Sequence, residues 1–276
     1  MFNYLELCQK VLNKGFTKEN RTGVKCKTIH GEMLKFNLEE GFPAVTTKRL
    51  HFKSVVAELL GFIRGYEFAS QFREAGTHIW DANANENPTW LENPNRIGKD
   101  HLGRIYGVQW RNCKGVDQLK ICIERLRVRD DNRRLIVNSW IPDELDYMAL
   151  PPCHFAFQFH IRDKEFLDLT WYQRSCDIAL GIPFNIASYA LLCHIVARCT
   201  NLKPGIVTGM FGDVHIYEPH IEKMNLQIQR STLPKPDLVM SPELKTFSDF
   251  EEFATTDHIY LLNYYHHPAI DYEFIV

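Results

Sequence analysis

The chain has 276 residues, of which 45% are hydrophobic and 24% charged, and its formal net charge is −2. No stretch approaches the roughly 20 apolar residues of a membrane span, and the first residues lack the basic and then apolar order of a signal peptide, so we expect a cytoplasmic protein without a membrane partner. Near-neutral charge gives no broad positive field for a long polyanion such as DNA, so any phosphate would be bound by a few local arginines.

The apolar pattern mixes helices and strands along the chain. Helical spacing predicts helices over residues 4–13 and 54–64. Residues 83–99 contain too much Asn, Pro and Gly for a long regular element, and we interpret about 83–104 as a loop-rich lobe on a single domain spanning 1–276. Strands are predicted at 135–140, 155–161 and 166–173, the second with Phe155, Phe157, Phe159 and Ile161 on one face, and a helix at 186–199.

The eight cysteines and twelve histidines show no arrangement typical of a metal site or a disulfide framework. No pair of cysteines has C-x-x-C spacing, and adjacent histidines such as His266 and His267 rarely bind one metal ion. We therefore expect reduced thiols, most of them small buried hydrophobic groups, and no metal.

Cys153 has an unusual local sequence. It follows Pro151 and Pro152, which hold the chain extended, and it begins the aromatic strand. A thiolate nucleophile needs nearby positive charge to lower its pKa, and His154 or an arginine could supply it. A buried structural cysteine is the alternative.

Arginines accompany Ser or Thr in loops and at strand ends, a combination that suits a phosphate monoester because the guanidinium fork matches phosphate oxygens. Arg133 and Arg134 could instead be solvated charges partnered by Asp130 and Asp131. The candidate phosphate ligands are Arg21, Arg133, Arg134, Arg174 and Ser175.

Several polar or aromatic residues stand in apolar surroundings. Glu58 lies off the apolar stripe of its helix, which predicts an exposed carboxylate. Asn185 precedes the predicted helix at 186, where an N-cap is the simplest interpretation. His215 and Tyr217 alternate on a strand and could donate to a sugar hydroxyl or be satisfied interior groups, and Trp80 is typical of a core.

Taken together, these motifs resemble the thymidylate synthase family in order and spacing over nearly the whole chain. The runs that carry the resemblance are Arg21-Thr22-Gly23, Phe42 to Arg49, Ala57 to Leu60, Ile79-Trp80-Asp81, Tyr106-Gly107, Asn132-Arg133-Arg134, Leu150 to His154, Tyr172 to Asp177, Pro183 to Tyr189 and Gly212 to Tyr217.

The resemblance implies reductive methylation of dUMP to dTMP, with 5,10-methylenetetrahydrofolate as co-substrate and dihydrofolate as the second product. Cys153 would attack C6 of uracil and make C5 nucleophilic, while Glu58 would organise water and proton transfer. The implied catalytic residues are Cys153, Glu58, Tyr106, His154, Asn185 and Asp177.

For dUMP, the resemblance places Arg21, Arg174 and Ser175 on the phosphate, with Arg133 and Arg134 from a second subunit. It places Asn185 on the uracil, and His215 and Tyr217 on the ribose 3′-hydroxyl. The implied folate-binding residues are Lys48, His51, Trp80, Leu150, Asp177, Gly181, Phe184 and Val276.

The folate side departs from the family pattern. Many members carry tryptophan where this chain has Gly61 and Asn83, and small residues before the terminal hydrophobe where it has Phe274-Ile275. Alternatives are a dUMP hydroxymethylase, in which water instead of hydride quenches the intermediate, and a non-catalytic nucleotide- or RNA-binding protein. Asn185 favours uracil over cytosine.

The fold that the resemblance implies is a single α+β domain with a large twisted mixed β-sheet flanked by helices. A homodimer would form through the face of that sheet. Its active sites would be shared, because Arg133 and Arg134 would serve the neighbouring subunit.

Overall fold

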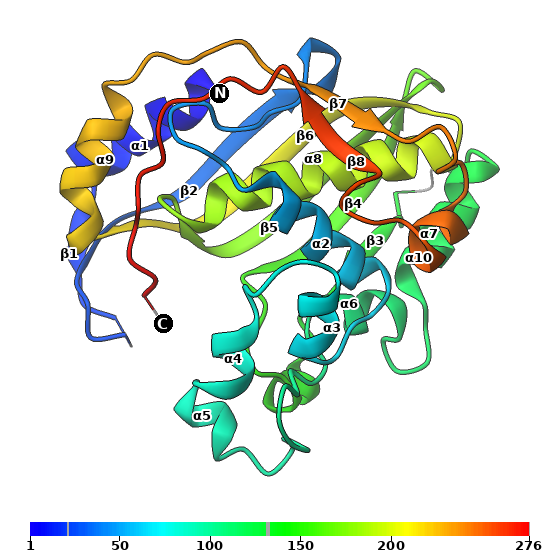
Figure 1. The fold of residues 1–276 in the computed structure, drawn as a ribbon, viewed down its shortest axis with the longest axis horizontal. Helices are drawn as coiled ribbons and strands as arrows, with labels where there is room; N and C mark the ends of the chain where they lie inside the picture. The colour runs from blue at the N-terminus through cyan, green and yellow to red at the C-terminus, as the bar shows by residue number, and fades with distance from the viewer. Residues whose placement is uncertain (21, 131–132, 276) are drawn as a thin grey trace.

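A twisted mixed sheet of six strands organises the structure, a computed structural model that describes every residue except 21, 131, 132 and 276 (Figure 1). The strand order is β1-β2-β6-β5-β4-β3, and neighbours are antiparallel except for the parallel pair β5 and β6. The strands are β1 (Phe16–Lys18), β2 (Cys26–Asn37), β3 (Ile136–Asn138), β4 (His154–Arg162), β5 (Phe166–Asp177) and β6 (Lys203–Tyr217). A separate antiparallel pair joins β7 (Asp237–Met240) to β8 (Ile259–Leu262).

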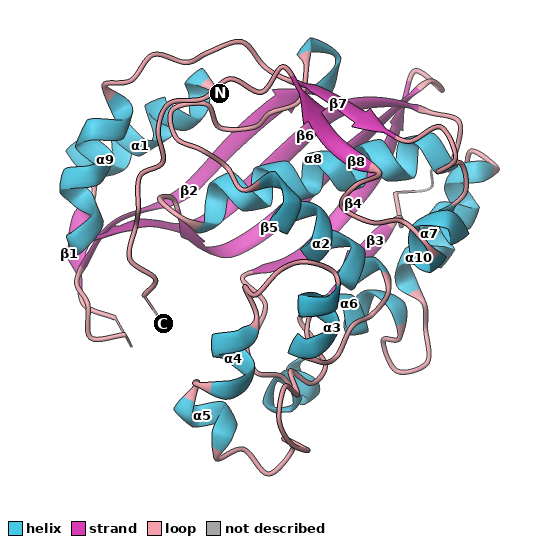
Figure 2. Ribbon diagram, in the orientation of Figure 1, coloured by secondary structure: helices cyan, strands magenta, loops and turns pink. Residues whose placement is uncertain are grey.

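Helices cover the sheet, with α8 against β5 and β6, α1 against β2, and α2 stacked on α8 (Figure 2). This arrangement confirms the α+β class. The helices are α1 (Phe2–Lys14), α2 (Phe52–Ile63), α3 (Ala69–Glu74), α4 (Asp81–Asn85), α5 (Pro88–Leu91), α6 (Tyr106–Arg111), α7 (Gln118–Arg127), α8 (Gly181–Cys199), α9 (Ile221–Ile228) and α10 (Phe247–Glu252), with 3-10 turns at Leu38–Glu40, Pro142–Tyr147 and Glu218–His220.

Helix α8 is the central core element. Among the described helices it alone is long and apolar enough to cross a membrane, but 78% of its apolar window is buried inside the protein. Its apolar composition is therefore accounted for by contacts with the sheet on one side and α2 on the other.

Strand β4 departs from the predicted alternation at its first residues. Phe157 and Phe159 are fully buried as expected, but Phe155 is only partly buried. The pairing of β4 with β5 is irregular between His154 and Ala156, and His154 is buried instead. The shift matters because it places the residue after Cys153 in the interior, so that the chain changes direction at the thiol.

The predicted loop-rich segment contains only the short helices α4 and α5 and turns, below the sheet in Figure 1. Its treatment as a lobe of one domain stays a prediction, and so does dimerisation through the sheet. The sheet surface for that contact would include the exposed or partly buried side chains of Lys35, Gln158, His160, Asp168, Thr170 and Thr208.

Candidate active site

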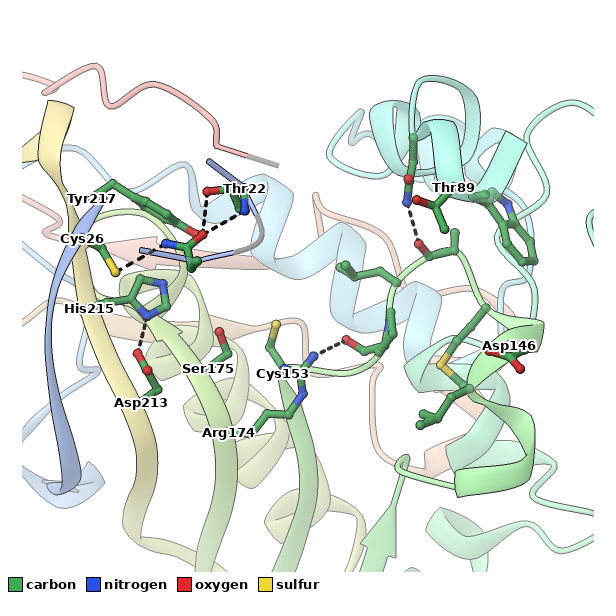
Figure 3. A pocket seen from close by; sticks show the side chains of 18 of the residues that line it. Thr22, Cys26, Thr89, Asp146, Cys153, Arg174, Ser175, Asp213, His215 and Tyr217 are labelled. Carbon is green, nitrogen blue, oxygen red and sulfur yellow. Dashed lines mark hydrogen bonds and ion pairs between the residues drawn. The ribbon is translucent and has the colours of Figure 1, made fainter. Parts of the chain in front are cut away.

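A cavity of about 510 Å³ lies between the ends of the central strands and the lobe (Figure 3). Strands β5 and β6 supply one wall, and α5 with the segment before β4 supplies the other. The lining residues used below are Lys18, Cys26, Trp90, Leu145, Met148, Leu150, Cys153, Arg174, Ser175, Asp213, His215 and Tyr217.

Cys153 is partly buried and lines this cavity, so its interpretation as a buried structural cysteine is wrong. Its backbone N–H donates to Tyr106 Oη at 2.9 Å, which fixes the position of the residue at the end of the extended Pro151-Pro152 segment. Cys8 and Cys193 differ: they are fully buried, and burial raises the pKa of each thiol to about 12. Cys153 is therefore placed where a ligand can reach it.

His154 lies behind the thiol, stacked on Tyr106 with ring centroids 4.3 Å apart and hydrogen-bonded to Tyr189 Oη at 2.8 Å. Burial lowers the pKa of His154 to about 3, so the ring is neutral at ordinary pH. The prediction that His154 could supply positive charge to the thiol is wrong. Its contacts suit a residue that holds Tyr106 in place.

Arg174 supplies the positive charge on this wall. Its Nε donates to Pro152 O at 2.9 Å and its Nη2 to Pro151 O at 3.0 Å, and its guanidinium lies over the Trp140 ring at 5.1 Å. Arginine has five N–H donors, so these two hydrogen bonds leave others for an anion. Ser175 follows on β5 and lines the same cavity, as the phosphate hypothesis requires.

The other predicted phosphate ligands are not brought to this cavity within the described chain. Arg133 and Arg134 are exposed before β3, and neither lines the cavity among the described residues. Arg21 lies outside the described residues. The grouping of these arginines around one phosphate therefore stays a prediction.

Asn185 lies inside α8, which begins at Gly181, so the N-cap interpretation is wrong. Just before the helix, Asp177 Oδ1 accepts hydrogen bonds from the N–H groups of Ala179 and Leu180, which orders the turn that leads into Gly181. Asn185 Oδ1 accepts from Gln173 Nε2 at 3.0 Å. This contact orients the amide and leaves its NH₂ group on the side away from Gln173.

Glu58 is partly buried, so the prediction of an exposed carboxylate is wrong. Helix α2 is buried nearly all round, and Trp80 donates its indole N–H to Glu58 Oε1 at 3.1 Å. Burial raises the pKa of Glu58 to about 7, and the hydrogen bond from Trp80 partly offsets that effect. A carboxyl group with this pKa can gain or lose a proton near neutral pH.

His215 and Tyr217 line the cavity from β6, with ring centroids 5.1 Å apart. Sequence reasoning missed Asp213, whose Oδ1 lies 2.9 Å from His215 Nδ1. The signal was present, because residues 213, 215 and 217 share one face of a strand. Lys18 was also missed, and it donates to Asp213 Oδ2 at 2.9 Å.

The predicted folate residues occupy different environments. Leu150 lines the cavity, whereas Trp80 is 5% exposed and His51 is exposed beside Ser54. Gly181 and Phe184 lie in the first turn of α8, next to Asp177. Val276 lies outside the described residues.

Lys48 is only 4% exposed and does not face open solvent. It donates to Ala179 O at 2.7 Å, and its ammonium lies 4.6 Å from the Tyr272 ring centroid. Burial lowers the pKa of Lys48 to about 8. In this conformation the ammonium is covered by the C-terminal segment, so its predicted place near a glutamate tail would require that segment to move.

A phenylalanine fills the space beside Gly61. A Cβ added at Gly61 would lie 2.4 Å from Phe72 Cε1, and Phe72 is fully buried against Trp80. Asn83 is 5% exposed on α4. The aromatic rings around Trp80 are thus supplied by Phe62, Phe72 and Tyr106, from α2, α3 and α6, instead of by residues 61 and 83. In the described part of the chain, no group of three His, Cys, Asp or Glu side chains could hold a metal ion.

Comparison with known proteins agrees with this geometry. The sequence model described as "Thymidylate synthase" matches residues 2–276. A protein of Pseudomonas syringae pv. tomato named thymidylate synthase is 37% identical over 98% of each chain. A protein of the same name from Pseudomonas putida is also 37% identical over 98% of each chain.

Proposed function

Because the chain belongs to the thymidylate synthase family, we propose that it methylates dUMP to dTMP with 5,10-methylenetetrahydrofolate and releases dihydrofolate. It is an enzyme of this family and a methyltransferase of dTMP biosynthesis. The observation that supports the residue assignments is the position of Cys153 in the cavity wall, beside Arg174 and Ser175.

Cys153 is the nucleophile. Its thiolate adds to C6 of the uracil ring, and the electron pair of the C5–C6 double bond moves toward C5 and the O4 carbonyl. Uracil C5 becomes a carbon nucleophile only through such a covalent adduct. Arg174 favours the thiolate by its charge, and Tyr106 holds the Cys153 backbone by accepting its N–H.

Arg174 and Ser175 bind the phosphate of dUMP from β5, and Arg21 is a further phosphate ligand. A phosphate monoester dianion suits guanidinium groups because each can donate parallel hydrogen bonds. Arg133 and Arg134 complete the set from a second subunit. Both side chains are exposed before β3, as a contact with a neighbouring chain across a homodimer interface requires.

Asn185 reads the uracil edge. Gln173 Nε2 occupies one lone pair of Asn185 Oδ1, which sets the amide orientation, and the NH₂ group is then directed to donate to O4. The remaining capacity of Oδ1 can accept from N3–H. Cytosine offers the opposite pattern at these positions, with a donor at C4 and an acceptor at N3, so it would bind less well.

The site also fits a flat aromatic co-substrate. The lobe-side wall carries Trp90, Leu145, Met148 and Leu150, which offer apolar surface next to the polar strand ends. When bound, the folate supplies the one-carbon unit and the hydride. Glu58 can hold a proton near neutral pH and so can organise proton transfer around the pyrimidine. Asp177, which accepts from the backbone just before α8, supports the end of β5, and His154, which stacks on Tyr106, supports the contact of Tyr106 with the Cys153 backbone.

The test is to incubate the purified protein with dUMP and methylenetetrahydrofolate and to identify both products. dTMP with dihydrofolate supports the proposal. 5-Hydroxymethyl-dUMP with tetrahydrofolate would assign a hydroxymethylase instead, and binding of dUMP with no product would assign a non-catalytic binding protein.

The matched variants are Cys153→Ala and Cys113→Ala. Both thiols are partly buried, but Cys153 lines the cavity and Cys113 does not. Cys153→Ala should abolish product formation while dUMP still binds, and Cys113→Ala should keep wild-type turnover. Turnover by the Cys153→Ala protein would remove the proposed nucleophile.

A further inference from the structure

Asp213 lies at the centre of a polar network in the cavity wall, and this network has no part in the proposed reaction steps. Oδ1 accepts a hydrogen bond from Thr28 Oγ1 at 2.9 Å and lies 2.9 Å from His215 Nδ1. Oδ2 accepts from Lys18 Nζ at 2.9 Å. Figure 3 shows Asp213 below the His215 ring, with the dashed contact running to the near edge of the imidazole.

This network determines which His215 nitrogen carries a proton. Hydrogen bonds from His215, Lys18 and Thr28 lower the pKa of Asp213 well below its usual range, so the group is a carboxylate. An ionised carboxylate only accepts hydrogen bonds. His215 Nδ1 must therefore bear the hydrogen, and in the neutral ring Nε2 is left with a lone pair.

His215 is held rigidly in this state. It is 7% exposed, its ring packs edge-on against Tyr217, and its backbone pairs with Thr28 on β2. Rotation of the ring would break the contact with Asp213. A ligand in the cavity therefore meets a fixed hydrogen-bond acceptor at Nε2, since the two ring nitrogens lie on different edges.

We propose that Asp213 is a positioning residue that makes His215 Nε2 an acceptor for the 3′-hydroxyl hydrogen of the nucleotide sugar. The proposal rests on the proposed function, because it takes dUMP as the ligand. What it adds to the expected contact of His215 with the sugar is the residue that decides which ring nitrogen accepts from the 3′-hydroxyl. Lys18 and Thr28 act through Asp213 by keeping it ionised and oriented.

The experiment measures Kd for dUMP and for 2′,3′-dideoxy-UMP, which lacks the hydroxyl, in wild type and variants. The readout is Kd for 2′,3′-dideoxy-UMP divided by Kd for dUMP, which measures how much the 3′-hydroxyl contributes to binding. A general structural change weakens the binding of both nucleotides alike and leaves this ratio unchanged. Asp213→Ala should reduce this ratio about tenfold, the effect of losing one well-oriented hydrogen bond. Asp213→Asn keeps a carbonyl that can accept from Nδ1–H, so it should reduce the ratio only about threefold.

His215→Ala and the Asp213→Ala/His215→Ala double variant complete a double-mutant cycle. His215→Ala should reduce the ratio as much as Asp213→Ala, and the double variant should show no further reduction, because both changes remove the same interaction. Asp237→Ala is the control, because Asp237 is exposed on β7 and does not line the cavity, and it should leave the ratio unchanged. Thermal unfolding of each variant checks that it is folded. If Asp213→Ala does not fold, the ratio measured for Asp213→Asn tests the proposal in its place.

An unchanged ratio in the folded Asp213 variants would overturn the proposal, as would equal weakening of both nucleotides. Additive effects of the Asp213 and His215 substitutions would overturn it too. These failures leave dTMP formation by the wild-type enzyme intact. Absence of dTMP formation and of dUMP binding by wild type would instead overturn the proposed function and this inference together.

Discussion

Trp80 Nε1 donates to Glu58 Oε1 at 3.1 Å, joining α2 to the start of α4 across 22 residues of chain. The contact holds a partly buried carboxyl group against a buried tryptophan. Burial nevertheless dominates, and the pKa of Glu58 is raised to about 7. A titratable group with this pKa affects both proton transfer and the pH dependence of stability.

Glu58→Gln should change stability in a pH-dependent way. Between the unfolded pKa near 4.5 and the folded pKa near 7, the native protein binds more protons than the unfolded chain, so wild-type stability falls as pH rises through this window. The variant lacks that fall. Urea unfolding at pH 4.5 and pH 7.5 should show the variant gaining about 3 kcal/mol on wild type, since each unit of the pKa difference is worth about 1.4 kcal/mol and the carboxyl of the unfolded chain is already half ionised at pH 4.5. A constant difference across pH would contradict the assignment.

Asn185→Asp should weaken the preference for uracil over cytosine. The carboxylate cannot donate to O4 of uracil, whereas it can accept from the exocyclic amine of cytosine. We expect the ratio of kcat/KM for dUMP over that for dCMP to fall at least tenfold, on the order of one lost and one mismatched hydrogen bond. Asn201→Asp, beyond the opposite end of α8, is the control and should keep the wild-type preference. If Asn185→Asp keeps the wild-type ratio of kcat/KM values, Asn185 does not determine base preference and its role is limited to its hydrogen bond with Gln173.

Mixing Arg134→Ala and Cys153→Ala proteins should restore activity if the sites are shared. After subunit exchange, half of the dimers are mixed, and each mixed dimer contains one site with an intact cysteine and an intact partner arginine. We therefore expect about a quarter of wild-type activity from two nearly inactive proteins. Mixing Cys153→Ala with an Arg174→Ala protein is the control and should restore less, if Arg174 and Cys153 belong to one subunit's wall. No gain in the first mixture would argue against sites shared through Arg134.

Tyr272→Phe should loosen the C-terminal segment. The Tyr272 hydroxyl donates to Gln227 Oε1 at 2.7 Å, and Gln227 is fully buried, so loss of the hydroxyl leaves that oxygen without this donor. The expected loss of stability is about 1–3 kcal/mol by thermal or urea unfolding. Tyr265→Phe is the matched control, because Tyr265 is 65% exposed, and it should change stability by less than about 0.5 kcal/mol. Equal effects of both substitutions would contradict the anchoring role.

Local sequence patterns predicted several elements well. The helices at 4–13 and 54–64 correspond to α1 and α2, and the strands at 155–161 and 166–173 to β4 and β5. Apolar spacing is sufficient there because each element buries one face or stripe against a neighbour. The predicted start of α8 at residue 186 is late, because the helix begins at Gly181 after a turn in which Asp177 accepts from the N–H groups of Ala179 and Leu180.

The errors within the candidate site have one physical origin. A helical wheel places Glu58 outward only if one side of α2 faces water, and here the helix is buried nearly all round. The charge of His154 likewise depends on burial, which lowers its pKa to about 3. Burial depends on segments distant in the chain, so no local pattern could reveal either result.

The sequence by itself determined the family, the α+β class and the identity of the candidate groups, because ordered motifs and residue chemistry are properties of the chain alone. Only the tertiary structure decided their states: Cys153 at the cavity wall, His154 neutral, Lys48 covered by Tyr272, and Asp213 against His215. Protonation and hydrogen-bond direction follow from which atoms surround a group and how much water reaches it. Those surroundings are assembled by folding from residues far apart in sequence.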